Sequence, residues 1–148
     1  MPMIEIEACR IRHLHAIAAD LRAEEKFELG VIGVEKPRHA MLSLYRDTLY
    51  PMAALVDGRA VAAWGDAAPP LAREGLLWFF SASMIERVPI SFAKIARREI
   101  ERMLIGRDIL RSSVHKSCER ALRFYRMLGF EAIEGTVIEG FVEIRISR

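Results

Sequence analysis

The stretch that decides the fold is CERALRFYRMLGFE, from Cys118 to Glu131. Its apolar residues recur at positions i, i+1, i+4 and i+7, so they share one face of a helix. They are Ala121, Leu122, Tyr125 and Leu128. Gly129 suits the left-handed residue that ends a helix, and Phe130 can fold back over the last turn. A tyrosine on a buried face brings a hydroxyl that needs a partner. Tyr125 is therefore either a packed residue whose hydroxyl reaches the surface or a main-chain carbonyl, or a residue that faces a ligand.

Length and composition indicate one globular domain, residues 1–148, with a single continuous core. The chain is 52% hydrophobic and 28% charged, with a formal net charge of +2. The charge is unevenly distributed, because the segment from Arg87 to Arg126 holds eleven Lys and Arg residues against four acidic ones. A basic half suits an anionic ligand, phosphorylated or nucleic.

The two cysteines, Cys9 and Cys118, have neither CxxC spacing nor a histidine partner in a metal-binding pattern. We therefore expect no metal site and two free thiols in a reducing cytoplasm, that of a bacterium or of a phage-infected host cell. The N-terminal MPMIEIEACRIR alternates apolar and charged residues, unlike a signal peptide. The longest apolar stretch, LLWFFSASMI, is far shorter than the roughly 20 residues that a membrane helix needs.

The first half of the chain begins with a strand in MIEIEACRI. From His13 the apolar period becomes helical and predicts one helix that ends near ELGVIGVEKP, followed by a second helix in RHAMLSLYRDTL. Asp57-Gly58 between two apolar runs is a strong hairpin signal. GLLWFFSASM would be apolar on both faces of a strand, which predicts a central strand covered on both sides.

The second half alternates helix and strand. SFAKIARREIERML predicts a helix, DILRSSVH a strand, the opening stretch a helix, and EAIEGTVIEGFVEIRI two strands around Gly135 or Gly140. The predicted order is β-α-α-β-β-β-α-β-α-β-β. It indicates an α/β fold with a mixed, mostly antiparallel β-sheet flanked by helices on both faces.

This order, together with the opening stretch, resembles the GNAT (Gcn5-related N-acetyltransferase) superfamily. Members show an Asn-x-x-Ala-x-x-x-Tyr-x-x-x-Gly-Phe motif in the last helix, and Ala121, Tyr125, Gly129 and Phe130 match it. Cys118 stands at the position of the Asn. The resemblance implies transfer of an acetyl group from acetyl-coenzyme A (acetyl-CoA) to an amine of unknown identity. It also implies that Tyr125 protonates the departing thiolate as a general acid.

The same resemblance implies which residues bind the coenzyme. Ser81, Ala82, Ser83 and Met84 fall where the central strand should splay and offer main-chain groups to the pantetheine arm. In ERVPISFAK, Arg87 takes the first position of the pyrophosphate loop, with Ser91 as a candidate N-cap that could help to hold an anion. Ile90 and Phe92 occupy positions where the family has glycines, and Pro89 has no N–H to donate. The implied coenzyme-binding residues are Ser81, Ala82, Ser83, Met84, Arg87, Ser91, Phe92 and Cys118.

A general base is harder to place, because LLWFFSASM contains no carboxylate. Asp66 and Glu74 flank the preceding loop, where solvated side chains are expected. His115 ends a predicted strand near the expected cleft, and its ordinary pKa suits proton transfer, although a structural histidine is the alternative. The candidate catalytic residues are therefore Tyr125 and His115.

Two other functions compete with acyl transfer. The Arg-x-Pro loop is similar to that of small GNAT-like phage and prophage proteins, of the podovirus internal virion type, which implies an inactive module in virion assembly with virion proteins as partners. Recurring arginines suit nucleic acid, but no nucleic-acid motif accompanies them, so a solvated helix face is the preferred interpretation. Pairing of terminal strands in a homodimer is also open.

Overall fold

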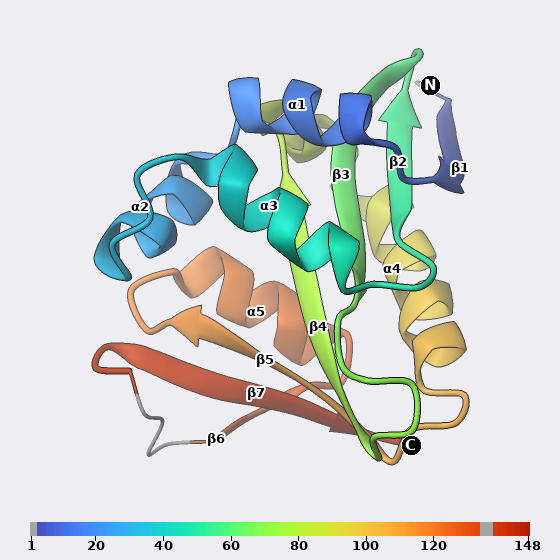
Figure 1. The fold of residues 1–148 in the computed structure, drawn as a ribbon, viewed down its shortest axis with the longest axis vertical. Coiled ribbons are helices and arrows are strands. Elements are labelled where there is room, and N and C mark those ends of the chain that lie inside the picture. The colour runs from blue at the N-terminus through green and yellow to red at the C-terminus, as the bar shows by residue number, and fades with distance from the viewer. Residues whose placement is uncertain (1–2, 134–137) are drawn as a thin grey trace.

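A computed structural model of the chain describes residues 3–133 and 138–148, and it contains one β-sheet with helices on both sides (Figure 1). The strands are β1 (Ile4–Ala8), β2 (Met52–Val56), β3 (Arg59–Asp66), β4 (Glu74–Ser81), β5 (Ile109–His115), β6 (Glu131–Ile133) and β7 (Phe141–Ser147). The helices are α1 (Ile11–Ala19), α2 (Ala23–Val31), α3 (Pro37–Arg46), α4 (Pro89–Met103) and α5 (Glu119–Met127), with a 3₁₀ turn η1 (Ser83–Arg87). The seven strands are ordered β1-β2-β3-β4-β5-β7-β6. The predicted mixed α/β fold is confirmed.

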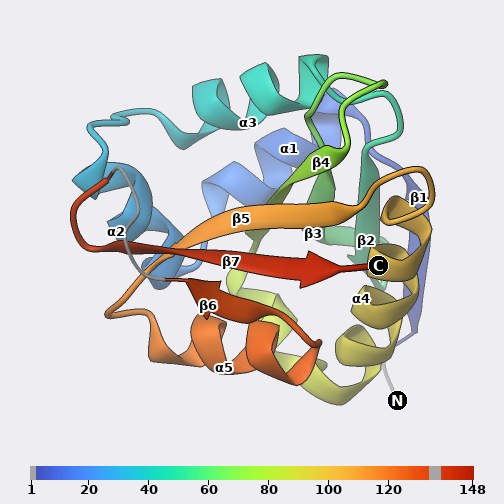
Figure 2. The same cartoon turned by 90° about the horizontal axis from the view of Figure 1, so that it is seen from below.

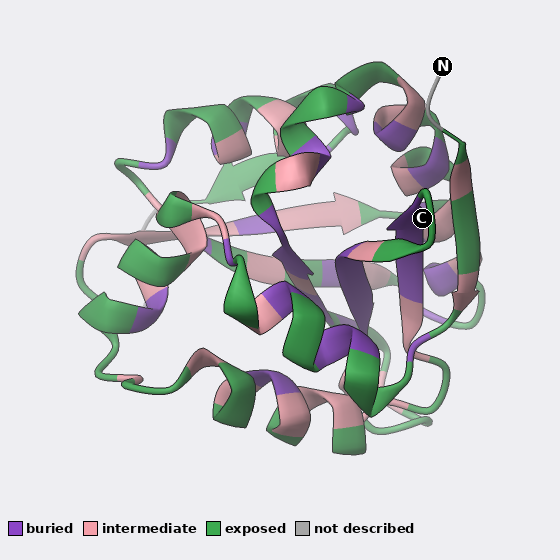
Figure 3. Cartoon of the chain, turned by 90° about the horizontal axis from the view of Figure 1, so that it is seen from above, coloured by how far each residue is buried: buried purple, intermediate pink, exposed green. Residues whose placement is uncertain are grey.

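The helices form two layers, one on each face of the sheet (Figure 2). Helices α1 to α3 cover one face, and α4 and α5 cover the other, each over its own apolar cluster. Strand β4 contributes to both, since Leu77 and Phe79 pack toward α4 and α5 while Trp78 and Phe80 pack toward α1 to α3. The helices expose their outer faces and bury the inner ones (Figure 3). No helix in the described part is long and apolar enough to cross a membrane.

Local turn chemistry accounts for two of the predicted boundaries. Asp57 and Gly58 have φ values of 49° and 80°, the left-handed pair that a two-residue hairpin between β2 and β3 needs. Gly129 has a φ of 105° after α5, and Phe130 donates its N–H to the Tyr125 carbonyl oxygen at 3.0 Å, as expected of a glycine-ended helix. Of the two glycines predicted between the last strands, Gly140 directly precedes β7, and Gly135 lies outside the described residues.

The prediction of one helix from His13 onward is wrong, because the chain leaves the helix at the end of α1 and starts a new one at Ala23. Leu21 forms an antiparallel bridge with Ala82, and the Arg22 N–H donates to the Ser81 carbonyl oxygen at 3.0 Å. Main-chain pairing with the end of β4 thus replaces helical hydrogen bonds. The break directs α2 across the end of the central strand.

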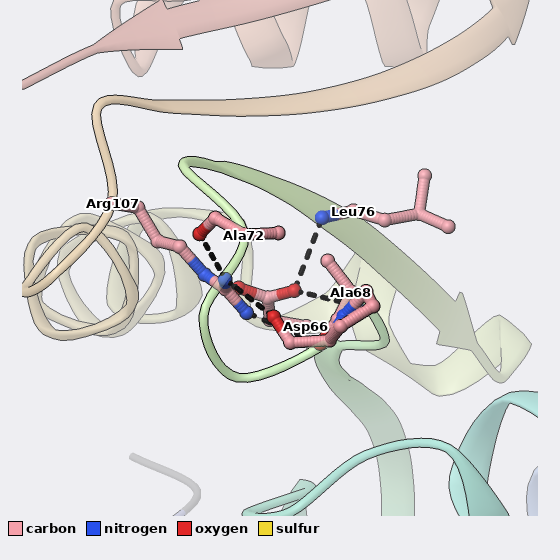
Figure 4. A network of polar contacts seen from close by, with 6 residues as sticks. Asp66, Ala68, Ala72, Leu76 and Arg107 are labelled. Atoms are coloured by element: carbon pink, nitrogen blue, oxygen red, sulfur yellow. Dashed lines mark hydrogen bonds and ion pairs between the residues drawn. The ribbon is translucent and has the colours of Figure 1, made fainter.

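The interpretation of Asp66 as a solvated loop residue is also wrong. Asp66 ends β3, and its Oδ2 accepts from the Nε of buried Arg107 at 2.9 Å (Figure 4). The other carboxylate oxygen accepts from the N–H groups of Ala68 and Leu76. Arg107 also donates to three carbonyls of the β3–β4 loop, those of Ala68, Pro69 and Ala72. This network fixes the loop at the end of the sheet opposite the β4 terminus.

Strands β4 and β5 form the one parallel contact of the described sheet, and it is short. Three pairs join them, Glu74↔Ile109, Gly75↔Leu110 and Leu76↔Arg111. Beyond these pairs β4 continues beside β3, and β5 continues beside β7. The two strands therefore diverge toward Ser81 and His115, and the sheet opens between them.

Candidate active site

A cavity of about 270 Å³ lies where β4 and β5 diverge. It is lined by α2, the end of β4, the start of α4, β5 and the inner face of α5. The lining residues are Arg22, Glu24, Glu25, Glu28, Phe79, Ile85, Glu86, Pro89, Phe92, Ser112, Ser113, Val114, Arg120, Ala121, Phe124 and Tyr125. Polar groups therefore meet mainly at the α2 side, and aromatic rings form the opposite wall.

Strand alternation directs main-chain groups into this cavity. The Ala82 N–H bonds the Val61 carbonyl oxygen on the β3 side, so the main-chain groups of Phe79 and Ser81 point the other way, toward β5. On β5 the Lys116 N–H donates to the Gly140 carbonyl oxygen, on the β7 side. Because main-chain groups alternate along a strand, the main-chain groups of Ser113 and His115 point toward β4. The cavity walls therefore present extended main-chain edges that the short β4–β5 pairing leaves unpaired.

Tyr125 lines the cavity from α5. Its ring packs edge-on against Phe124 and Phe130 at centroid distances of 6.0 and 5.3 Å. Burial raises the pKa of the phenol above its ordinary value, and the charges of Glu25 and Glu28 raise it further. The hydroxyl therefore stays protonated at neutral pH and can donate a proton.

Two carboxylates of α2 reach the divergent strand ends. Glu25 accepts from the Ser81 N–H at 2.8 Å and from the Ser81 hydroxyl at 2.9 Å. Glu28 accepts from the His115 N–H at 2.9 Å. Burial raises the pKa of Glu25 to about 8, and it also raises the pKa of Glu28. Glu25 can therefore exchange a proton near physiological pH, and Glu28 holds its proton more tightly than a free glutamate.

The two arginines of the cavity are paired with acids at its rim. Arg22 lies 3.7 Å from Glu24 and 3.4 Å from Glu86, and Arg120 lies 3.5 Å from the same Glu86. Glu86 thus links α5 to the turn that starts α2.

Sequence reasoning identified two of the lining residues, Tyr125 and Phe92. Phe92 is buried and packs against Phe79 and Phe124, with ring centroids 5.6 and 6.2 Å away. It fills the interior at the start of α4 with an aromatic side chain.

The structure places the other predicted residues of the β4–α4 connection around the cavity rather than in its lining. Ser81 reaches it through Glu25, whereas Ala82 pairs with Leu21 and Ser83 donates to Asp20 at 2.7 Å. Met84 lines a separate surface depression beside α1, and Arg87 is exposed at the end of η1. The prediction of Ser91 as an N-cap is wrong: α4 begins at Pro89, which suits a first helical position, and Val88 is the cap.

His115 and Cys118 are not among the residues that line the cavity. The His115 imidazole packs between Phe27 and Phe141, and its Nδ1 accepts from the Ser117 N–H at 3.1 Å. It reaches the site through its main-chain N–H, which binds Glu28. Cys118 is buried at the start of α5, and burial raises its pKa to about 11.

Sequence reasoning missed the acids of α2. Glu24, Glu25 and Glu28 lie on one side of a helix by their spacing, which was the available signal. An acidic helix face is normally interpreted as solvent-exposed surface. The break at Leu21 changes the direction of the chain, so that this face of α2 points toward the cavity. Within the described residues no cluster of three or more His, Cys, Asp and Glu side chains could hold a metal ion.

The raised pKa of Glu25 predicts a pH dependence of stability. Its pKa is about 8 in the folded chain against 4.5 for the free side chain, so the folded state binds the proton more tightly. The free energy of unfolding should therefore fall as pH rises from about 4.5 to about 8, with a slope approaching 1.4 kcal/mol per pH unit. Urea unfolding across this range measures the slope.

Glu25→Gln should reduce that slope, because the amide keeps the shape and an acceptor for Ser81 without a titrating charge. Glu35→Gln, at an exposed position after α2, is the matched control and should leave the slope unchanged. Equal slopes in both variants would show that Glu25 is not the titrating group.

Comparison with known proteins finds no family model and no curated protein that matches the sequence. Solved structures do match over nearly the whole chain. A GNAT-family acetyltransferase from Streptococcus pneumoniae is 11% identical, with a TM-score of 0.62 over 98% of this chain and 99% of that chain. The PaiA N-acetyltransferase of Thermoplasma acidophilum, solved with coenzyme A, is 15% identical, with a TM-score of 0.71 over 99% of both chains.

A third structure, the GNAT domain of PAT from S. lividans, is 12% identical, with a TM-score of 0.72 over 98% of this chain and 90% of that chain. All three cover the described strands and helices from β1 to β7 rather than one substructure. The chain therefore has the fold of the GNAT acetyltransferases.

Proposed function

We propose that the protein transfers an acyl group, in the simplest case acetyl, from acyl-coenzyme A to an amine. The observation that carries this proposal is the divergence of β4 and β5 over a cavity that Tyr125 lines. An extended amide chain suits this opening, because Phe79 and Ser113 offer main-chain donors and acceptors along its edges. The Thermoplasma acidophilum relative, which has the same fold, was solved with coenzyme A.

The residues of the β4–α4 connection fit the phosphates of the coenzyme in part. First-turn N–H groups of α4 at Ile90 and Ser91 have no partner within the helix, and a helix N-terminus favours an anion. Exposed Arg87 and rim residue Arg120 supply positive charge nearby. Pro89 offers no N–H, so we assign phosphate binding to these two arginines as much as to the helix.

The chemistry follows from the groups in the cavity. When bound, the coenzyme would supply an acyl thioester. As the amine nitrogen bonds to the acyl carbon, the ionised member of the Glu25–Glu28 pair takes the proton that the nitrogen loses. As the carbon–sulfur bond breaks, Tyr125 gives its phenolic proton to the sulfur. The carboxylate then releases its proton to solvent, and Tyr125 takes one from solvent, which restores both groups.

The first test is binding of coenzyme A measured by thermal shift. At saturation we expect the melting temperature to rise by about 5 °C, because a ligand that binds only the folded chain stabilises it. ATP at the same concentration is the control, since it carries phosphates but no pantetheine arm. Release of free thiol from acetyl-CoA, dependent on an added amine, then tests transfer. No shift at millimolar coenzyme and no thiol release with any amine would overturn the proposal.

The second candidate is a non-catalytic interaction module, as in virion assembly. It is favoured by the start of α4, where Phe92 fills the interior and Ile90 is 77% exposed. A helix start that presents an isoleucine to solvent suits a protein partner better than a phosphate. This candidate predicts that the chain binds no coenzyme A and that Ile90→Ser abolishes capture of its partner.

A further inference from the structure

The main-chain groups at the open end of the cavity are already occupied by α2. The Ser81 N–H and hydroxyl both donate to Glu25, and the Ser81 carbonyl oxygen accepts from the Arg22 N–H. On the opposite strand the His115 N–H donates to Glu28. These groups of Ser81 and His115 are the outermost members of the two edges that a bound chain would use. Residues of α2 and of the turn before it therefore supply hydrogen-bond partners to the main-chain groups that the divergence of β4 and β5 leaves without a strand partner.

Helix α2 itself is weakly packed. Leu29 is its one buried residue, whereas Phe27, Val31 and the following Ile32 are each more than 40% exposed. A helix with so little buried apolar area opens at low free-energy cost.

One end of α2 is anchored more firmly than its body. The preceding turn is tied to the end of β4 by the Leu21–Ala82 bridge and by the Ser83 N–H, which donates to the Asp20 carbonyl oxygen at 3.0 Å. Displacement of the helix body can therefore pivot about residues 20–22 without unpairing the central strand.

We propose that α2 is an autoinhibitory strap, in which Glu25 and Glu28 hold the donor groups of Ser81 and His115 until a ligand displaces them. This inference rests on the proposed function, since the displacing ligand is the acyl-coenzyme. An acyl carbonyl and the Glu25 carboxylate compete for the same Ser81 N–H. When they are ionised, Glu25 and Glu28 also place negative charge against an anionic ligand, and this repulsion adds to the competition.

The experiment compares coenzyme A binding, by isothermal titration calorimetry, in wild-type protein, Glu25→Ala and Glu35→Ala. Glu35→Ala removes the same charge from an exposed position. We expect Glu25→Ala to lower the Kd about tenfold, because it removes the acceptor that competes with the ligand for the Ser81 N–H and hydroxyl. Glu35→Ala should match the wild type. Glu25→Gln, which preserves packing, should show a smaller gain and guards against loss of fold.

A second readout does not depend on the coenzyme. The Ser81 amide should exchange its hydrogen at least about ten times faster in Glu25→Ala than in wild type, because its acceptor is gone. Unchanged exchange would show that Glu25 does not protect this amide and would overturn the strap. Equal Kd values for wild type and Glu25→Ala would overturn the strap and leave the proposed function intact. Absence of binding in every variant would overturn both.

Discussion

Tyr125→Phe should lower kcat for acyl transfer by about 100-fold or more while leaving KM for acetyl-CoA nearly unchanged. General acid catalysis typically contributes about 10²- to 10⁴-fold, and the substitution removes only the proton that the departing sulfur would receive. The ring, its contact with Phe130 and the cavity wall are retained. Steady-state thiol release with saturating amine measures both constants.

Tyr45→Phe is the matched control, since Tyr45 is a half-buried tyrosine of α3 packed on the opposite face of the sheet. It should leave kcat within about twofold of wild type. A loss below about threefold in Tyr125→Phe would assign Tyr125 to packing, the alternative that its position on the helix left open.

Arg107→Ala should lower the free energy of unfolding by about 3–5 kcal/mol, because Arg107 is buried and pairs with the Asp66 carboxylate. The change leaves the half-buried Asp66 carboxylate without its cation and three loop carbonyls without a donor. Urea denaturation at pH 7 measures the loss.

Arg98→Ala provides the comparison, because Arg98 lies exposed on α4 and its removal should cost less than about 0.5 kcal/mol. The double substitution Asp66→Asn with Arg107→Met should recover part of the loss, since no unpaired charge remains. A cost for Arg107→Ala no greater than that for Arg98→Ala would contradict the role assigned to this network.

The fold was predictable where the determining interactions are local. Asp57 and Gly58 specify their hairpin by their own backbone preferences, and Gly129 ends α5 for the same reason. The apolar character of β4 on both faces requires two covering layers, whatever those layers are. Tyr125, which lines the cavity, was singled out because its helix carries a recognisable pattern.

The α2 side of the site was not predictable, because it depends on contacts between distant residues. Glu25 and Ser81 are 56 positions apart, and Asp66 and Arg107 are 41 apart. The apolar spacing of LHAIAADL is helical up to Leu21 and does not indicate that Leu21 pairs with Ala82. The sequence therefore predicts that the helix continues through the break. A buried acid and a solvated acid also look identical in sequence until the partner is known.

The shortness of the β4–β5 contact has a consequence for how the domain unfolds. Three residue pairs join a four-stranded half of the sheet to a three-stranded half, too few to make the halves melt together. The side chains under α4 and α5 do join them, because one cluster contains Val61 and Trp64 from one half and Leu110 and Ile144 from the other. Cooperativity of unfolding therefore depends on this apolar cluster rather than on the hydrogen bonds of the sheet, so we expect the two halves to unfold together although β4 and β5 diverge.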